Sequence, residues 1–123
     1  MIKPSTRDEL KRILQDRRIR YGAGTKKNPI SFNDVDVSEI TNMSMMFRGR
    51  PHFSYIDISE WDVSNVTDAH EMFDGSKLLM SVGDISEWDV SNIQDSENMF
   101  RQCNVSIIPN WYDITTHRKR NDS

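Results

Sequence analysis

One string of nine residues occurs twice in this chain, letter for letter. DISEWDVSN occupies positions 57–65 and recurs at 84–92, 27 positions later. Met-Phe pairs begin at positions 46, 72 and 99, at intervals of 26 and 27 residues. A fixed period between 20 and 50 residues is typical of repeat arrays, in which each unit buries its apolar face against its neighbours. The repeat therefore predicts stacked units.

The residues before each Met-Phe pair fall into register. VDVSEITNMSMMF begins at Val35, WDVSNVTDAHEMF at Trp61 and WDVSNIQDSENMF at Trp88. They share Asp, Val and Ser at positions two to four and a β-branched apolar residue at position six. A fourth, damaged copy, IIPNWYDIT, begins at Ile107 and has one extra residue after its Trp. The chain thus contains three to four units.

Each unit predicts one short strand and one short helix. Apolar residues alternate in IDISEWDVSN, which favours a strand with a kink. Val66, Ala69, Met72 and Phe73 then follow at spacings of three, three and one, which favours a short helix that ends at Gly75. One strand and one helix per 26 or 27 residues is the leucine-rich-repeat type of coil. The predicted fold is an α/β repeat, a leucine-rich-repeat-like solenoid of about three to four short coils.

The charge divides the chain into three segments. Residues 1–27 carry nine Lys or Arg against three Asp or Glu, a net charge of +6. Residues 28–116 carry four against fifteen, which is −11, and residues 117–123 carry three against one, which is +2. We interpret these as an N-terminal basic capping helix and hinge, an acidic repeat solenoid, and a basic flexible tail. Thr6 and Glu9 form a capping box that predicts the start of the helix.

Several function classes find no support in the sequence. Cys103 is the only cysteine, which excludes an internal disulfide and a zinc site built on paired cysteines. The three histidines occupy non-equivalent positions and no phosphate-binding loop is present, so we expect no enzyme and no cofactor. The N-terminus has no signal peptide and no apolar run approaches the roughly 20 residues of a membrane helix. These features predict a cytoplasmic protein that binds no membrane.

The repeat motif resembles a known family. Asp-Ile-Ser-x-Trp-Asp-Val-Ser-Asn-Val-Thr-Asp with a following Met-Phe resembles the BspA-type leucine-rich-repeat proteins, often bacterial surface proteins, over residues 30–115. The opening KPSTRDELK is similar to the helix that precedes such repeats. The resemblance implies a right-handed solenoid that binds protein and carries out no known chemistry. A short member without an export signal indicates a dedicated cytoplasmic partner, and phage or mobile-element inhibitors are often of this size.

The candidate binding residues are mainly acidic residues that recur at the same position of successive repeats. We call each such set a column. In stacked repeats, equivalent residues recur roughly 5 Å apart. The alternatives are that the Asp residues cap turns, or that they bind calcium, although the Gly-rich nonapeptide of repeat calcium sites is missing. The candidate partner-binding residues, with two from the variable segments 48–55 and 74–83, are Asp57, Glu60, Asp62, Asp84, Glu87, Asp89, Tyr55 and Arg48.

Three partners fit these residues. The first is another protein, bound through the solenoid face and the loops between repeats. The second is a basic nucleic-acid-binding protein, such as a nuclease or CRISPR effector. The stacked acidic residues would block the site at which it binds nucleic acid. The third is a second copy of the chain, stacked on the solenoid ends. Because the total charge is negative, we expect no direct contact with nucleic acid.

Overall fold

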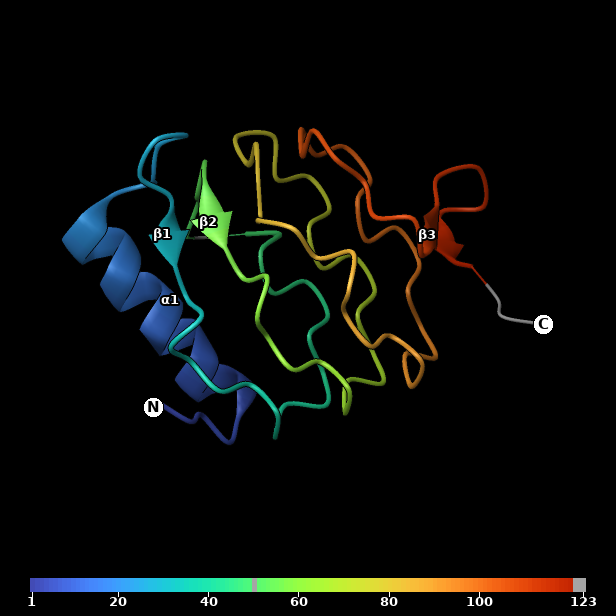
Figure 1. Ribbon diagram of the computed structural model, residues 1–123, viewed down its shortest axis with the longest axis horizontal. Coiled ribbons are helices and arrows are strands. Elements are labelled where there is room, and N and C mark those ends of the chain that lie inside the picture. Colours follow the sequence, from blue (N-terminus) through green and yellow to red (C-terminus); the bar gives the residue numbers. More distant parts are fainter. Residues whose placement is uncertain (50, 121–123) are drawn as a thin grey trace.

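The computed structural model describes residues 1–49 and 51–120. Its regular elements in these residues are one helix, α1 (Arg7–Tyr21), and four short strands: β1 (Ile30–Ser31), β2 (Ile56–Asp57), β3 (Tyr112–Asp113) and β4 (Arg118–Lys119). β1 pairs with β2 in parallel, and β3 pairs with β4 antiparallel. Figure 1 shows α1 at one end of the molecule, β3 at the other, and mostly irregular turns between them.

The predicted right-handed leucine-rich-repeat-like solenoid is wrong. Among the described residues the repeats contain no α-helix, and the strands form two separate two-stranded sheets rather than one ladder. The helix expected over residues 66–75 is replaced by turns. The residue before each Met-Phe pair has a left-handed backbone, with φ of 56° at Met45, 54° at Glu71 and 59° at Asn98. Because an α-helix of L-residues needs a negative φ, the chain turns at these positions instead.

Successive repeats nevertheless lie side by side in register. The backbone amide of Met43 donates to the carbonyl of Asp68 at 2.8 Å, and one repeat later that of Ala69 donates to Asp95 at 2.8 Å. Asp68 forms isolated parallel bridges with Asn42 on one side and with Asp95 on the other. Single bridges and turns therefore hold the repeats together where we had expected strands and helices.

Two residues of the repeated string, its Trp and its Asn, donate side-chain hydrogen bonds to the preceding repeat. Trp61 donates its Nε1 hydrogen to the carbonyl of Phe32, 29 positions earlier, at 2.9 Å. Asn65 donates its side-chain amide to the carbonyl of Ser38 at 2.8 Å. The same bonds recur one and two repeats later, from Trp88 to Ile58, Trp111 to Ile85 and Asn92 to Ser64. The Trp and Asn of DISEWDVSN thus satisfy buried or turn carbonyls of the neighbour.

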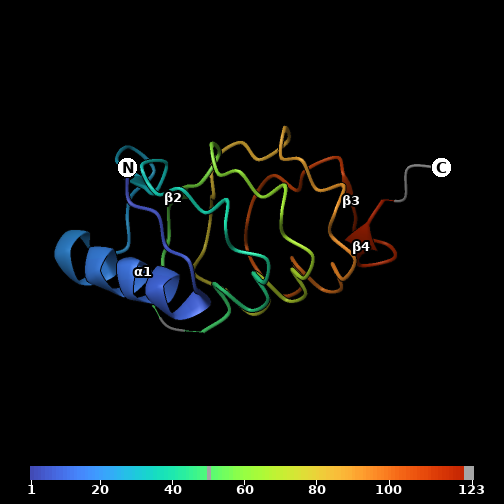
Figure 2. The same cartoon turned by 90° about the horizontal axis from the view of Figure 1, so that it is seen from below.

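The core runs through the whole array. Phe47, Phe73 and Phe100, the aromatic residues of the three Met-Phe pairs, stack with ring centroids 5.4 and 5.2 Å apart. Leu10 and Leu14 of α1 are fully buried against the first repeat. Figure 2 shows α1 covering the N-terminal end of the array. Each repeat is too small to bury these residues alone, so the core exists only between neighbours.

Polar contacts join both terminal segments to the repeats. Thr6 accepts a hydrogen bond from the Glu9 amide at 3.2 Å, as the capping box predicts. Arg7 donates to the carbonyl of Asn42 at 2.7 Å. At the other end, Lys119 of β4 donates from Nζ to the carbonyl of Val90 at 3.0 Å. Of the segment predicted as a flexible tail, 118–119 form β4, and 121–123 lie outside the described residues.

Candidate protein-binding face

An aspartate caps one turn in every repeat. Asp62 accepts from the backbone N and the Oγ of Ser64, at 3.0 and 2.6 Å, and Asp89 accepts from Ser91 at 3.1 and 2.6 Å. The damaged fourth copy keeps this cap, because Asp113 bonds to the residue two positions on at 2.9 and 2.6 Å. The bonds from Ser91 favour the charged carboxylate and lower the pKa of Asp89. Turn capping is therefore what holds these side chains in place.

Asp57 and Asp84 are capped in the same way. Their Oδ1 atoms accept from the amides of Ser59 and Ser86, each at 3.0 Å. The pKa of Asp84 is lowered by its bonds from Ser86. Partial burial opposes ionisation of Asp57, but its pKa is also lowered, because the bonds from Ser59 and Asn33 outweigh burial. Both side chains are therefore carboxylate anions at neutral pH.

Glu60 and Glu87 stand in a column whose first member is Asp34. Arg17 of α1 neutralises Asp34 through two bonds of 2.5 and 2.7 Å. Glu60 and Glu87 are exposed, and their side chains make no hydrogen bond or ion pair with a described residue. The helix thus neutralises only the first carboxylate of the column.

The acidic face, as we name it, comprises six carboxylates on two neighbouring repeats. They lie at the outward positions beside the buried Ile58, Trp61, Ile85 and Trp88. Within the described residues none of the six takes part in an ion pair, whereas some of the other acids are paired with Lys3, Arg17 and further basic residues. The members are Asp57, Glu60, Asp62, Asp84, Glu87 and Asp89. All six were candidates in the sequence.

Arg48, another candidate, lies in a separate charge cluster. Its guanidinium is 3.1 Å from Glu71 and 3.9 Å from Asp74. Arg101 bonds to both oxygens of Asp74, at 3.1 and 2.9 Å, and lowers the pKa of this buried carboxyl. Arg48, Asp74 and Arg101 occupy equivalent positions in three repeats, so the alternation of charge down this column was a signal for their pairing that we did not use.

Tyr55 lies beside Asp57 along a shallow groove. The groove has a volume of about 390 Å³ and crosses the repeats next to β1 and β2. Tyr55 is half-buried in its wall. The structure therefore brings two of the eight candidate residues to one concave site.

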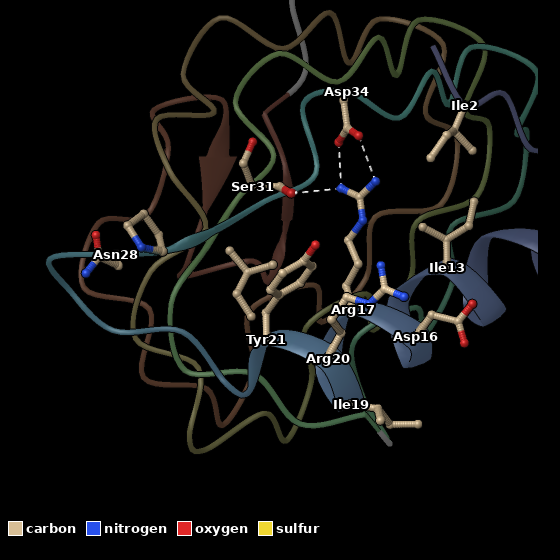
Figure 3. Close-up of a pocket in the computed structure, with 12 residues that line it drawn as sticks. Ile2, Ile13, Asp16, Arg17, Ile19, Arg20, Tyr21, Asn28, Ser31 and Asp34 are labelled. Atoms are coloured by element: carbon tan, nitrogen blue, oxygen red, sulfur yellow. Dashed lines mark hydrogen bonds and ion pairs between the residues drawn. The ribbon is translucent and has the colours of Figure 1, made fainter.

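A larger groove of about 1120 Å³ lies between α1 and β1, as Figure 3 shows. Arg17 projects across it, bonding Asp34 and the Ser31 carbonyl, the latter at 3.0 Å. Ile19 and Tyr21 on its rim are 84% and 62% exposed. Sequence reasoning missed this groove, because it depends on the placement of α1 against the first repeat.

Among the described residues, one group of side chains has the composition of a metal site. His70 Nδ1 is 2.6 Å from Asp68 Oδ1 and 3.7 Å from Asp95 Oδ2. Hydrogen bonding accounts for this arrangement, because Asp68 Oδ1 also accepts from the His70 amide at 3.1 Å. Cys103 is half-buried, and burial raises its pKa, which disfavours the thiolate that nucleophilic chemistry needs.

Comparison with known families places the chain. The profile of a family described as a Mycoplasma protein of unknown function, DUF285, matches residues 18–117, about four fifths of the chain. The chain belongs to this family. Searches among curated proteins and among solved structures gave no match. The DUF285 match covers all three complete repeats and all eight candidate residues.

The DUF285 match bears on two predictions. It confirms kinship with a repeat family, but at a coarser level than the BspA-type resemblance. Within the described part of the DUF285 chain, no helix is both long enough and apolar enough to cross a bilayer. The cytoplasmic location stays a prediction.

Proposed function

We propose that this DUF285 chain is a non-enzymatic module that binds another protein through its acidic face. The observation that carries the proposal is the lack of ion pairs at all six carboxylates of this face among the described residues. Like charges that lie opposite one another on neighbouring chain segments are unfavourable, and a basic partner would supply the opposite charge. Elsewhere among the described residues, Arg17, Arg48 and Arg101 pair with carboxylates of the chain itself.

Preorganisation supports the same proposal. Four of the six carboxylates are already fixed by bonds to the amide two residues on, as Asp62 is by Ser64. A partner would not have to immobilise these side chains, which lowers the entropic cost of association. Their field would also accelerate encounter with a basic surface.

The experiment compares two doubly neutralised variants. Glu60→Gln with Glu87→Gln removes two charges from the acidic face. Asp16→Asn with Glu97→Gln removes two exposed charges elsewhere and serves as the matched control. Tagged forms of the wild type and of both variants capture partners from a lysate of the source cell, and affinity for the captured protein is then measured with purified components. We expect the face variant to weaken binding and the control to retain it; equal affinities would refute the proposal.

A second candidate function is inhibition of a protein that binds nucleic acid through a basic cleft, such as a nuclease or CRISPR effector. The regular spacing favours it, because carboxylates about 5 Å apart resemble the closely spaced charges of a phosphate backbone. In this case the captured protein is a nucleic-acid enzyme, added DNA or RNA competes with the chain for it, and binding falls steeply with salt. A partner that DNA and RNA fail to displace would favour the general binding module.

We also propose a closer relation to the BspA-type proteins within the DUF285 kinship. The support is the twofold DISEWDVSN string followed by Met-Phe. The proposal concerns descent and a protein-binding role, and it does not extend to the leucine-rich-repeat fold. A profile built from the repeat alone tests it: BspA-type repeats should score above other DUF285 repeats of equal length.

A further inference from the structure

One position of the repeat contributes a row of residues to the groove beside β1 and β2. Pro29, Tyr55 and Ser81 line it at successive intervals of 26 residues, and Ser106 continues the row in the fourth copy. Strands in register lie about 4.8 Å apart, so three intervals give a length of about 14 Å. The groove therefore runs along the direction in which the repeats stack, and its length matches about four residues of extended chain.

The walls of the groove combine apolar surface with one fixed charge. Tyr55 is half-buried and Met80 is 39% exposed, so both offer apolar surface to a ligand. Asp57 also lines the groove, held by the Ser59 amide at 3.0 Å and kept as an anion. Lys26 is the only basic residue in the described lining, and it is exposed.

Charge complementarity selects the occupant. Gly83 lines the groove beside Asp57, and the next residue, Asp84, is exposed. Glu60, three residues after Asp57, is exposed as well. An acidic ligand would meet repulsion from these carboxylates. A purely apolar ligand would cover Asp57 without giving it a partner, which is unfavourable for a charged group. A cation with an apolar stem avoids both penalties.

We propose that this groove binds an extended polypeptide segment that carries an arginine or a lysine. The aliphatic stem lies over Tyr55 and Met80, and the cationic group bonds to Asp57. The Tyr55 ring adds a cation–π contact where the cation passes over its face. The inference rests on the proposed function, because it names the chemistry of the segment by which the partner enters the acidic face.

The test uses the purified chain and fluorescein-labelled synthetic hexapeptides measured by fluorescence anisotropy. One peptide places a single arginine among Gly and Ser. The second replaces the arginine with citrulline, which keeps the shape and removes the charge, and a third replaces it with Glu. We expect the arginine peptide to bind and the other two to bind at least about tenfold more weakly, in line with the strength of a charge-assisted hydrogen bond. Equal binding of arginine and citrulline peptides overturns the proposal.

Two single variants locate the site. Asp57→Asn keeps an oxygen that can accept from the Ser59 amide and removes the charge, and Met80→Ser removes apolar surface from an exposed residue. We expect both variants to bind the arginine peptide more weakly than the wild type does, while their circular dichroism spectra stay unchanged. The double variant Glu60→Gln with Glu87→Gln is expected to reduce peptide affinity less than Asp57→Asn does.

The outcomes separate this inference from the proposed function. If peptide binding survives Asp57→Asn but is lost on changing Glu60 and Glu87, the cation binds to the acidic face, and the groove proposal is wrong while the face proposal stands. If Asp57→Asn abolishes peptide binding but the captured partner binds every variant equally, the groove binds cations and the proposed function fails.

Discussion

The two identical nine-residue copies share a set of hydrogen bonds but lie in different surroundings. In both, the first Asp caps the Ser two positions on, and the Trp and Asn donate to the preceding repeat. Their exposure differs: Asp57 and Ser64 are half-buried, whereas Asp84 and Ser91 are exposed. The first copy lies between two complete repeats, and the second adjoins the damaged fourth one. Local hydrogen bonding therefore follows the sequence, whereas burial follows the neighbour.

The approach to each copy differs by one residue. Ile56 leads directly into the first copy, but Gly83 is inserted between Val82 and the second, which makes that interval 27 instead of 26 residues. Gly83 has φ of +83°, and a Cβ there would lie 2.4 Å from Asp57 Oδ1. A glycine fits this position because it tolerates the left-handed backbone and leaves room for the neighbouring carboxylate.

The largest expected effect comes from removing the tryptophan of either copy. We expect Trp61→Ala to lower the free energy of unfolding by about 3–5 kcal/mol, because it leaves a cavity and removes one of the two hydrogen bonds that the carbonyl of Phe32 accepts. Trp88→Ala should cost less, because Trp88 stacks on the half-buried Trp111, which can shift to fill the space. Urea denaturation of both variants measures the difference. An equal or larger loss in Trp88→Ala would show that the damaged repeat supports its neighbour as firmly as a complete one does.

Substitution of the inserted glycine, Gly83, should give the next largest loss of stability. Gly83→Ala combines a left-handed alanine with a clash against Asp57, and we expect a loss of about 2–3 kcal/mol. Gly75→Ala is the matched control: its φ is +71°, but nothing lies within 4 Å of the new Cβ, so only the backbone strain of about 1 kcal/mol applies. Adding Asp57→Ala to Gly83→Ala should recover part of the loss in urea denaturation. Equal losses in the two glycine variants would mean that the clash is absorbed by small movements.

The sequence predicts the period, the register and the helix cap of this molecule, but not how each repeat folds. The caps at Asp62 and Asp89 could be anticipated, because Asp-x-Ser is a local signal. The turns could not be anticipated, because the three left-handed positions, Met45, Glu71 and Asn98, are not glycines. The apolar spacing around them also fits a helix. The acidic columns were predictable from the repeat, whereas the two grooves depend on contacts between distant residues.

The capped aspartates give a smaller effect that depends on pH. Asp57 and Asp84 have pKa values lowered in the folded state, so the stability that they contribute is present above the pKa of an unfolded Asp, about 3.9, and is lost as the pH falls through the folded value. Asp57→Asn and Asp84→Asn should each make the free energy of unfolding fall less steeply between pH 6 and pH 2. Urea denaturation across this range measures the slopes. Slopes equal to that of the wild type would mean that the caps persist in the unfolded chain.

The smallest expected effect on stability distinguishes Asp34, which is paired with Arg17, from Glu60 and Glu87, which have no ion pair with a described residue. Asp34 is bonded to Arg17, so Asp34→Asn removes an ion pair and should lower the stability, whereas Glu60→Gln and Glu87→Gln remove like charges from neighbouring repeats and should raise it. Because these side chains are exposed, each change should stay below about 0.5 kcal/mol. Both changes in stability, the decrease and the increase, should become smaller in high salt, which screens attraction and repulsion alike. A loss of stability in the two Glu variants would mean that these carboxylates support the fold, and the main reason for assigning them to a partner would disappear.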